Sequence, residues 1–309
     1  SGNVIWSIFK DSDGDIWVGT DKGIDQYIYG LDQFKRYDLG SKPISILQDE
    51  TNGSIIIASE NTGLHLINKK DGSIRSFKND PNDGFSISSN GFNINQHNPI
   101  AIDELGNIWV ATDNGLNYYR KDKDIFTRFN QREGLSGNKI NTLMAKGDYI
   151  YVGSSKGLDR INIKSFNIEK LSGNVWFSFT GLYGVNKILK FPSGQGFWMA
   201  TTGGLVYATD IYGEEIFSDI EWFGLFGQWI NNINLDKNEN LWIDVNSFTG
   251  LIRLETKEVL AYGMSDNDDF YRIFSPDENG TLKEVLGDYN EKFSAVNTNL
   301  PGRKVRSWH

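Results

Sequence analysis

Short apolar strands separated by polar turns recur along the whole chain. The clearest example is Gly14-Asp15-Ile16-Trp17-Val18-Gly19-Thr20, in which apolar residues alternate around a central tryptophan. The polar turn Asp11-Ser12-Asp13-Gly14 precedes it, and Gly23-Ile24 begins another apolar stretch after it. Alternating apolar residues bounded by Asp, Asn and Gly turns predict antiparallel strands that are joined by hairpins.

This unit occurs six times. Equivalent stretches lie at residues 55–59, 106–112, 150–154, 197–201 and 241–244, and each is followed within a few residues by Gly-Leu. A small residue usually ends the central strand, and the equivalent positions are Gly19, Ala58, Ala111, Gly153, Ala200 and Asp244. They recur at intervals of 39 to 53 residues, with a mean of 45. A period of about 40 to 50 residues with four short strands per unit is typical of propeller blades.

The pattern therefore predicts an all-β fold: a single seven-bladed β-propeller of four-stranded antiparallel blades over residues 1–309. The predicted blades span residues 4–39, 43–78, 99–130, 139–171, 185–218, 230–263 and 270–300. The polar residues 79–98 are interpreted as an insertion, and blade seven diverges from the repeat after Gly280. Residues 301–309 resemble the first strand of a further repeat. Either this strand pairs at the closure of the ring, or the ring is cut from a longer array, which is the alternative we expect.

Composition and charge exclude several kinds of partner and site. The net charge is −9 and the basic residues are scattered, which disfavours nucleic acid and anionic membranes as partners. The chain has no cysteine, so disulfides and thiolate metal sites are excluded. The absence of cysteine does not determine the cellular compartment. Its three histidines lie far apart in the sequence, so we expect neither a metal site nor a cofactor. The chain contains no run of about 18 apolar residues, so the sequence predicts no membrane-spanning helix.

Two aromatic insertions are the candidate binding residues. They lie before predicted blades five and six, within residues 174–179 and 221–229. Because the links between blades share one face of a propeller, we expect them side by side at one rim. The predicted ligand-binding residues are Asn174, Trp176, Phe179, Trp222, Phe223, Gln228 and Trp229. Aromatic rings can stack on the C–H face of a sugar, while amides bind its hydroxyls. Alternatively, these aromatics pack against a second propeller or fill the local core.

Three further polar features have a structural and a functional interpretation. Residues 11–15 resemble the start of a calcium loop, but Lys22 stands where that loop needs glutamate, so we predict a hairpin turn. His65 follows Gly-Leu and is predicted to pack on a third strand. Asp244 replaces the small residue of the repeat. It is either a polar group that faces the pore or a local irregularity, and we favour the irregularity.

The repeats resemble the two-component regulator propeller repeat, in which Asp-x-x-Gly-x-(Leu/Ile)-Trp-(Ile/Val)-Gly-Thr is followed by Gly-Leu. Residues 11–24 and 103–116 match this pattern nearly throughout. The resemblance implies the periplasmic sensor region of a hybrid two-component system with histidine kinase and response regulator domains. It implies a non-enzymatic region that detects an oligosaccharide and regulates polysaccharide utilisation. The partners it implies are that oligosaccharide, a second propeller and an immunoglobulin-like domain of the same chain, and a second receptor copy in a homodimer.

Two other functions are consistent with a seven-bladed propeller. Streptogramin lyases are similar in length and in the Gly-Asn-Leu-Trp strand, but no histidine constellation like theirs is found here. The third alternative is a structural scaffold in a surface or secretion complex. Since fold does not determine function, experiments must distinguish the sensor, the lyase and the scaffold. A lyase turns over its substrate with magnesium, a sensor binds an oligosaccharide without turnover, and a scaffold binds a protein.

Overall fold

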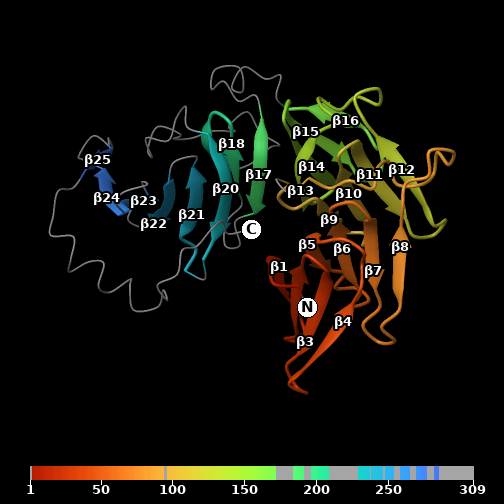
Figure 1. Ribbon diagram of the computed structural model, residues 1–309. Coiled ribbons are helices and arrows are strands. Elements are labelled where there is room, and N and C mark those ends of the chain that lie inside the picture. Colours follow the sequence, from red (N-terminus) through yellow and green to blue (C-terminus); the bar gives the residue numbers. More distant parts are fainter. Residues whose placement is uncertain are drawn as a thin grey trace. The chain divides into compact units, whose positions relative to one another are not determined.

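The computed structural model describes residues 2–93, 96–171, 184–190, 196–208, 229–236, 238–245, 248–253, 258–264, 269–276 and 282–284. All the regular secondary structure of these residues is β-strand (Figure 1). The described part of the chain contains no helix long and apolar enough to cross a membrane. The chain divides into two compact units, residues 1–188 and residues 189–309.

The first unit contains four four-stranded antiparallel sheets, and in each the strands follow chain order. Sheet 1 is β1 (Ile5–Lys10), β2 (Ile16–Thr20), β3 (Gly23–Ile28) and β4 (Gln33–Tyr37), and sheet 2 is β5 (Pro43–Gln48), β6 (Ile55–Ser59), β7 (Gly63–Ile67) and β8 (Ile74–Phe77). Sheet 3 is β9 (Ile100–Ile102), β10 (Ile108–Thr112), β11 (Gly115–Arg120) and β12 (Ile125–Phe129), and sheet 4 is β13 (Ile140–Lys146), β14 (Tyr149–Ser154), β15 (Gly157–Asn162) and β16 (Ile168–Lys170). The predicted all-β fold of repeated four-stranded antiparallel sheets is therefore confirmed.

The remaining strands form two more sheets. β17 (Val185–Lys190), which begins in the first unit, β18 (Phe197–Thr201) and β19 (Gly204–Ala208) form a three-stranded sheet in that order. A six-stranded sheet follows, in the order β20 (Ile230–Leu235), β21 (Leu241–Val245), β22 (Phe248–Arg253), β23 (Glu258–Met264), β24 (Asp269–Pro276) and β25 (Leu282–Glu284). The strands expected to begin blade seven, β24 and β25, thus continue the sheet of β20–β23. The described residues show six sheets, and the count of seven blades stays a prediction.

The Gly-Leu step of the repeat has a steric reason. Gly115 begins β11 with a φ of +99°, a backbone conformation that favours glycine. A Cβ at Gly115 would lie 2.6 Å from the carbonyl oxygen of Phe129 in β12. Glycine therefore allows both the tight turn between β10 and β11 and the close approach of the outer strand.

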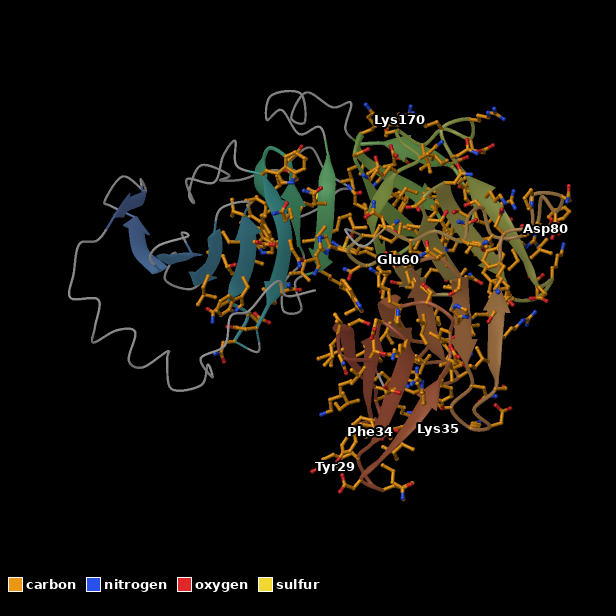
Figure 2. The ribbon with its side chains drawn as sticks, in the orientation of Figure 1. Tyr29, Phe34, Lys35, Glu60, Asp80 and Lys170 are labelled. Carbon is orange, nitrogen blue, oxygen red and sulfur yellow. The ribbon has the colours of Figure 1, made fainter. Side chains whose placement is uncertain are left out.

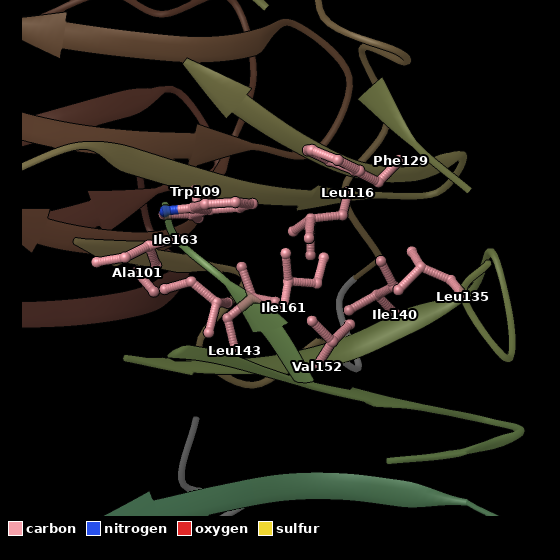
Figure 3. Close-up of a cluster of buried hydrophobic side chains, with 12 residues drawn as sticks. Ala101, Trp109, Leu116, Phe129, Leu135, Ile140, Leu143, Val152, Ile161 and Ile163 are labelled. Carbon is pink, nitrogen blue, oxygen red and sulfur yellow. The ribbon is translucent and has the colours of Figure 1, made fainter. Parts of the chain in front are cut away.

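The core of the first unit lies between neighbouring sheets. Where sheet 3 meets sheet 4, Trp109 and Leu116 pack against Leu143, Val152 and Ile161 (Figure 3). Equivalent residues form the contacts between sheets 1 and 2 and between sheets 2 and 3. In every case the tryptophan and leucine positions of one sheet meet the isoleucine and valine positions of the next. This packing explains why one apolar pattern recurs in each repeat.

The small residue of the repeat is required by this packing. A Cβ at Gly153 would lie 2.6 Å from Cγ2 of Thr142 on the neighbouring strand β13 and 2.8 Å from Cγ1 of Val185 on β17. Side chains cannot approach so closely without a shift of one of them, so only a very small residue fits where sheets come together.

Candidate functional site

The hairpin between the first two strands of a sheet is organised by an aspartate. One carboxylate oxygen of Asp11 accepts hydrogen bonds from the backbone N–H groups of Asp13 and Asp15, both at 3.0 Å. The other oxygen accepts from Nε1 of Trp17 at 2.8 Å. Residues 11–15 therefore form the predicted hairpin turn. Asp103 makes the same contacts in sheet 3, including the bond from Nε1 of Trp109 at 2.9 Å.

A lysine of the following sheet lies among these carboxylates. Nζ of Lys69, in the turn after β7, lies 2.5 Å from Asp11, 2.6 Å from Asp13 and 3.8 Å from Asp15. Burial would raise the pKa of Asp11, but the hydrogen bonds from Lys69 and Trp17 outweigh it and hold that pKa below its usual value. The ammonium group therefore occupies the place between the carboxylates that a calcium ion would need. Lys121 reaches Asp49 in the same way from the next sheet, at 2.8 Å.

Replacing Lys69 with methionine is expected to lower the free energy of unfolding by about 1–3 kcal/mol, because the buried carboxylate of Asp11 loses its cation. Lys70→Met is the matched control, since Lys70 is adjacent and exposed. Urea denaturation followed by circular dichroism measures both variants. Equal stability of the two would contradict the assignment of Lys69 as the stabilising partner.

A buried polar position recurs two residues after the glycine of each third strand. In the first unit it is occupied by Asp25, His65, Asn117 and Asp159. The side chain of Asn117 accepts from the backbone N–H of Ser88 at 2.8 Å, and Asp159 accepts from the backbone N–H and hydroxyl of Ser136. Both serines belong to the links between sheets. Asn117 and Asp159 therefore position the links rather than present a reactive group to a substrate.

His65 occupies the same position in sheet 2 and is packed on the third strand, as predicted. It is buried, and its ring nitrogens lie 3.0 Å from the hydroxyl of Thr62 and 2.8 Å from that of Ser76. Burial, with a smaller contribution from the charge of Lys78, lowers the pKa of His65 to about 4. The imidazole is therefore neutral at physiological pH and satisfied by two hydroxyl groups.

The expectation for Asp244 needs correction. It lies on β21, is exposed, and pairs regularly with Asn232 on β20 and Thr249 on β22. The register shift beside it, between Ile230 and Asn232, has counterparts in β1, β5 and β13. This bulge is thus a feature of the repeat, and Asp244 causes no irregularity of its own.

Of the seven predicted ligand-binding residues, the structure describes one. Trp229 directly precedes β20 and is 49% exposed. The other six, Asn174, Trp176, Phe179, Trp222, Phe223 and Gln228, lie outside the described residues. The aromatic surface that they would form together stays a prediction.

The bulge in β1 positions a cluster that the sequence pattern did not reveal. Nζ of Lys42 lies 3.9 Å from the centre of the Trp6 ring and 2.9 Å from the carboxylate of Glu60. Nε1 of Trp6 is buried and has no hydrogen-bond acceptor among the described residues. None of the three residues belongs to the repeat pattern. The aromatic residue at position 6 was the one feature of the sequence that could have indicated the cluster. The ammonium group covers the ring, so this cluster stabilises the ends of sheets 1 and 2.

Metal-binding chemistry is not indicated in the described ranges. They contain no cluster of three His, Asp or Glu side chains that could hold a metal ion. The acidic side chains nearest to such an arrangement are those around Lys69, and they are engaged by its ammonium group.

The first repeat and about half of the chain are similar to known proteins. The family described as two component regulator propeller matches residues 1–22. Histidine kinase P4 of Formosa agariphila is 29% identical over 177 residues, which are 54% of this chain and 13% of that protein. The match to the first repeat confirms the resemblance that the repeat pattern indicated.

Solved structures of low sequence identity share the fold. The extracellular domain of the putative hybrid two component system BT3049 from B. thetaiotaomicron is similar with a TM-score of 0.66 and 20% identity, over 91% of this chain and 40% of that one. That of BT4673 has a TM-score of 0.61 and 18% identity, over 89% and 37%. PorZ of the Porphyromonas gingivalis type-IX secretion system has a TM-score of 0.60 and 11% identity, over 90% and 45%. The chain thus spans less than half the length of each of these proteins.

Proposed function

We propose that this chain is the extracytoplasmic, ligand-sensing propeller of a hybrid two-component receptor. The observation that carries the proposal is the repeat itself, because its Asp-x-x-Gly turn and tryptophan strand match the two component regulator propeller in residues 1–22. The histidine kinase relative and the fold shared with extracellular domains of hybrid two-component systems support it. The corresponding location is the periplasm, with kinase and regulator domains elsewhere in a longer protein.

We infer a binding role for this region rather than catalysis. The buried carboxylates and the buried histidine for which partners are described are used within the fold: Asp11 binds Lys69 and Trp17, Asp159 binds Ser136, and His65 lies between two hydroxyl groups. Groups held in this way are poorly placed to exchange protons with a substrate. Incubation with magnesium and a streptogramin tests the alternative, because product formation would establish a lyase.

The ligand that we propose is an oligosaccharide. The half-exposed indole of Trp229 offers a flat apolar surface, and sugars bind such surfaces through their C–H faces. The full proposed site adds Asn174, Trp176, Phe179, Trp222, Phe223 and Gln228 from the two aromatic insertions. In the complete receptor, a second propeller, an immunoglobulin-like domain and a second receptor copy are the proposed partners.

Replacing Trp229 with alanine is expected to weaken oligosaccharide binding at least about tenfold and to leave the melting temperature within a few degrees, because the side chain is half exposed. Trp242→Ala is the matched control. Trp242 is also partly exposed, but it pairs with Asn234 near the hairpin turn at the other end of β20 and β21. Calorimetric titration with plant, host and microbial oligosaccharides measures the affinity. Equal affinities of the two variants would contradict a role for Trp229 in binding.

A further inference from the structure

Three cationic side chains gather at the end of sheet 4 over which the link from sheet 3 passes. Arg132 and Lys139 belong to this link, which is residues 130–139, and Lys156 lies in the turn between β14 and β15. All three are exposed, and none forms an ion pair within the described part of the chain. The whole chain carries a net charge of −9, so this cationic cluster is a local exception.

The backbone holds the two lysines of the cluster side by side. The N–H of Ser155, which directly precedes Lys156, donates to the carbonyl oxygen of Lys139 at 3.2 Å. The stem of Lys156 lies on the backbone of Gly137, because a Cβ there would lie 3.1 Å from Cγ of the lysine. A glycine at position 137 therefore gives room for the lysine stem beside the link.

The fold of the link brings Arg132 toward the same place. The backbone N–H of Gln131 donates to Oδ1 of Asn138 at 2.8 Å. Since Arg132 follows Gln131 and Lys139 follows Asn138, this bond brings the two cationic residues close together. Glu133 is the one carboxylate of the link, and it accepts a hydrogen bond from the backbone of the link itself. Positive charge therefore exceeds negative charge at this end of sheet 4.

The other sheets of the first unit carry a carboxylate where sheet 4 has a serine. The first residue of the turn between the second and third strands donates its backbone N–H to the preceding link, and in sheets 1 to 4 it is Asp21, Glu60, Asp113 and Ser155. In sheet 2 the carboxylate of Glu60 pairs with Lys42 at 2.9 Å. Lys42 and Lys139 are equivalent, because each directly precedes the first strand and accepts the bond from this turn. Ser155 therefore leaves Lys139 without the carboxylate that Lys42 has.

The repulsion within the cationic cluster has no internal compensation. Lys170 also extends from the end of β16 into solvent (Figure 2), but its cross-strand neighbour is the buried Asp159. Lys139 and Lys156 have no carboxylate at ion-pair distance among the described residues. Like charges held side by side lower the stability of a fold, and arrangements that cost stability are expected at functional sites. The cluster therefore favours an anion that a ligand supplies.

The surroundings of the cluster suit a hydrated ligand better than a protein. None of the large exposed hydrophobic side chains of the described residues lies in the link or in the turn that holds Lys156. The side chains beside the cations are amides and a hydroxyl, from Gln131, Asn138 and Ser155. Protein interfaces are instead anchored by aromatic and apolar groups.

We propose that the cationic cluster binds the carboxylate or sulfate group of an acidic oligosaccharide. Arg and Lys bind such anions through charge-assisted hydrogen bonds, and the neighbouring amides bind sugar hydroxyls. The inference rests on the proposed function, to which it adds the charge of the ligand. The site consists of Arg132, Lys139 and Lys156 and does not include the predicted aromatic residues.

Calorimetric titration with three tetrasaccharides tests the charge preference: galactotetraose, tetragalacturonic acid and a sulfated galactose tetrasaccharide. We expect at least one acidic tetrasaccharide to bind at least about tenfold tighter than the neutral one. This advantage should shrink between about 10 mM and about 150 mM sodium chloride, because salt screens exposed charges. The two acidic sugars distinguish a carboxylate from a sulfate group. Equal affinity for the neutral sugar would overturn the inference and leave the proposed function intact. No binding of any of the three would contradict both, and tighter binding of hexaglutamate would indicate a protein partner instead.

Ser155→Glu tests the cluster itself. It places a carboxylate beside Lys139, as Glu60 lies beside Lys42 in sheet 2. We expect the affinity for the acidic tetrasaccharide to fall at least about tenfold. The melting temperature should stay within a few degrees, because the new carboxylate gains an ion pair. Ser165→Glu is the matched control, since it adds the same charge in an exposed turn at the opposite end of sheet 4. An unchanged affinity of Ser155→Glu, or an equal loss in both variants, would overturn the proposal.

Discussion

Replacing Trp109 with alanine is expected to lower the free energy of unfolding of the first unit by about 3–5 kcal/mol. The indole is fully buried between sheets 3 and 4, where it packs with Leu116 and Phe129 (Figure 3). Its removal leaves a cavity that the surrounding strands cannot fill. It also removes the donor at 2.9 Å from the buried carboxylate of Asp103, and such a carboxylate is costly to leave without one of its hydrogen bonds.

Urea denaturation followed by tryptophan fluorescence and far-ultraviolet circular dichroism measures this loss. Trp109→Phe separates the two contributions, because phenylalanine restores most of the apolar volume but not the hydrogen bond to Asp103. We expect it to cost about 1–3 kcal/mol, between the alanine variant and the unmodified chain. If both variants were as stable as the unmodified chain, the packing of Trp109 between sheets 3 and 4 would not stabilise the first unit.

Acidification from pH 7 to pH 4 is expected to remove about 3 kcal/mol of stability through His65 alone. Its pKa is lowered from 6.5 to about 4 by burial, so the folded state binds the proton less well than the unfolded state. The contribution of a group with a lowered pKa is present above the unfolded value and is lost as the pH falls toward the folded value. The affected window is therefore pH 6.5 to 4.

His65→Asn tests this prediction, because Asn117 fills the equivalent position of sheet 3 with a side chain that does not titrate. The variant should lose most of the pH dependence between pH 6.5 and 4, as measured by urea denaturation at each pH. The lowered pKa values of Asp11 and Asp49 act below their ordinary value of 3.8, so their contribution is lost in a separate, more acidic window. An unchanged slope in the variant would exclude His65 as the titrating group.

The sequence by itself determined the strand pattern of this protein. Alternation around Trp17 and Trp109 and the glycine at Gly23 and Gly115 predicted antiparallel strands and tight turns, and both were found. These features depend on neighbours along the chain, since backbone conformation and the two-residue period of a strand are local properties. The repeat interval then predicted a series of similar sheets, because the same apolar face must be covered in each.

Only the tertiary structure decided which polar residues meet. Lys69 and Asp11 are 58 positions apart and carry no mutual signal in the sequence, yet their charges pair at 2.5 Å. The role of the third-strand position was equally hidden, because Asn117 and Asp159 bind serines of the links between sheets, whereas His65 binds the hydroxyl of Ser76 on its own sheet. Burial within the first unit was decided by the fold as well, since it depends on what lies opposite a strand and not on its own residues alone.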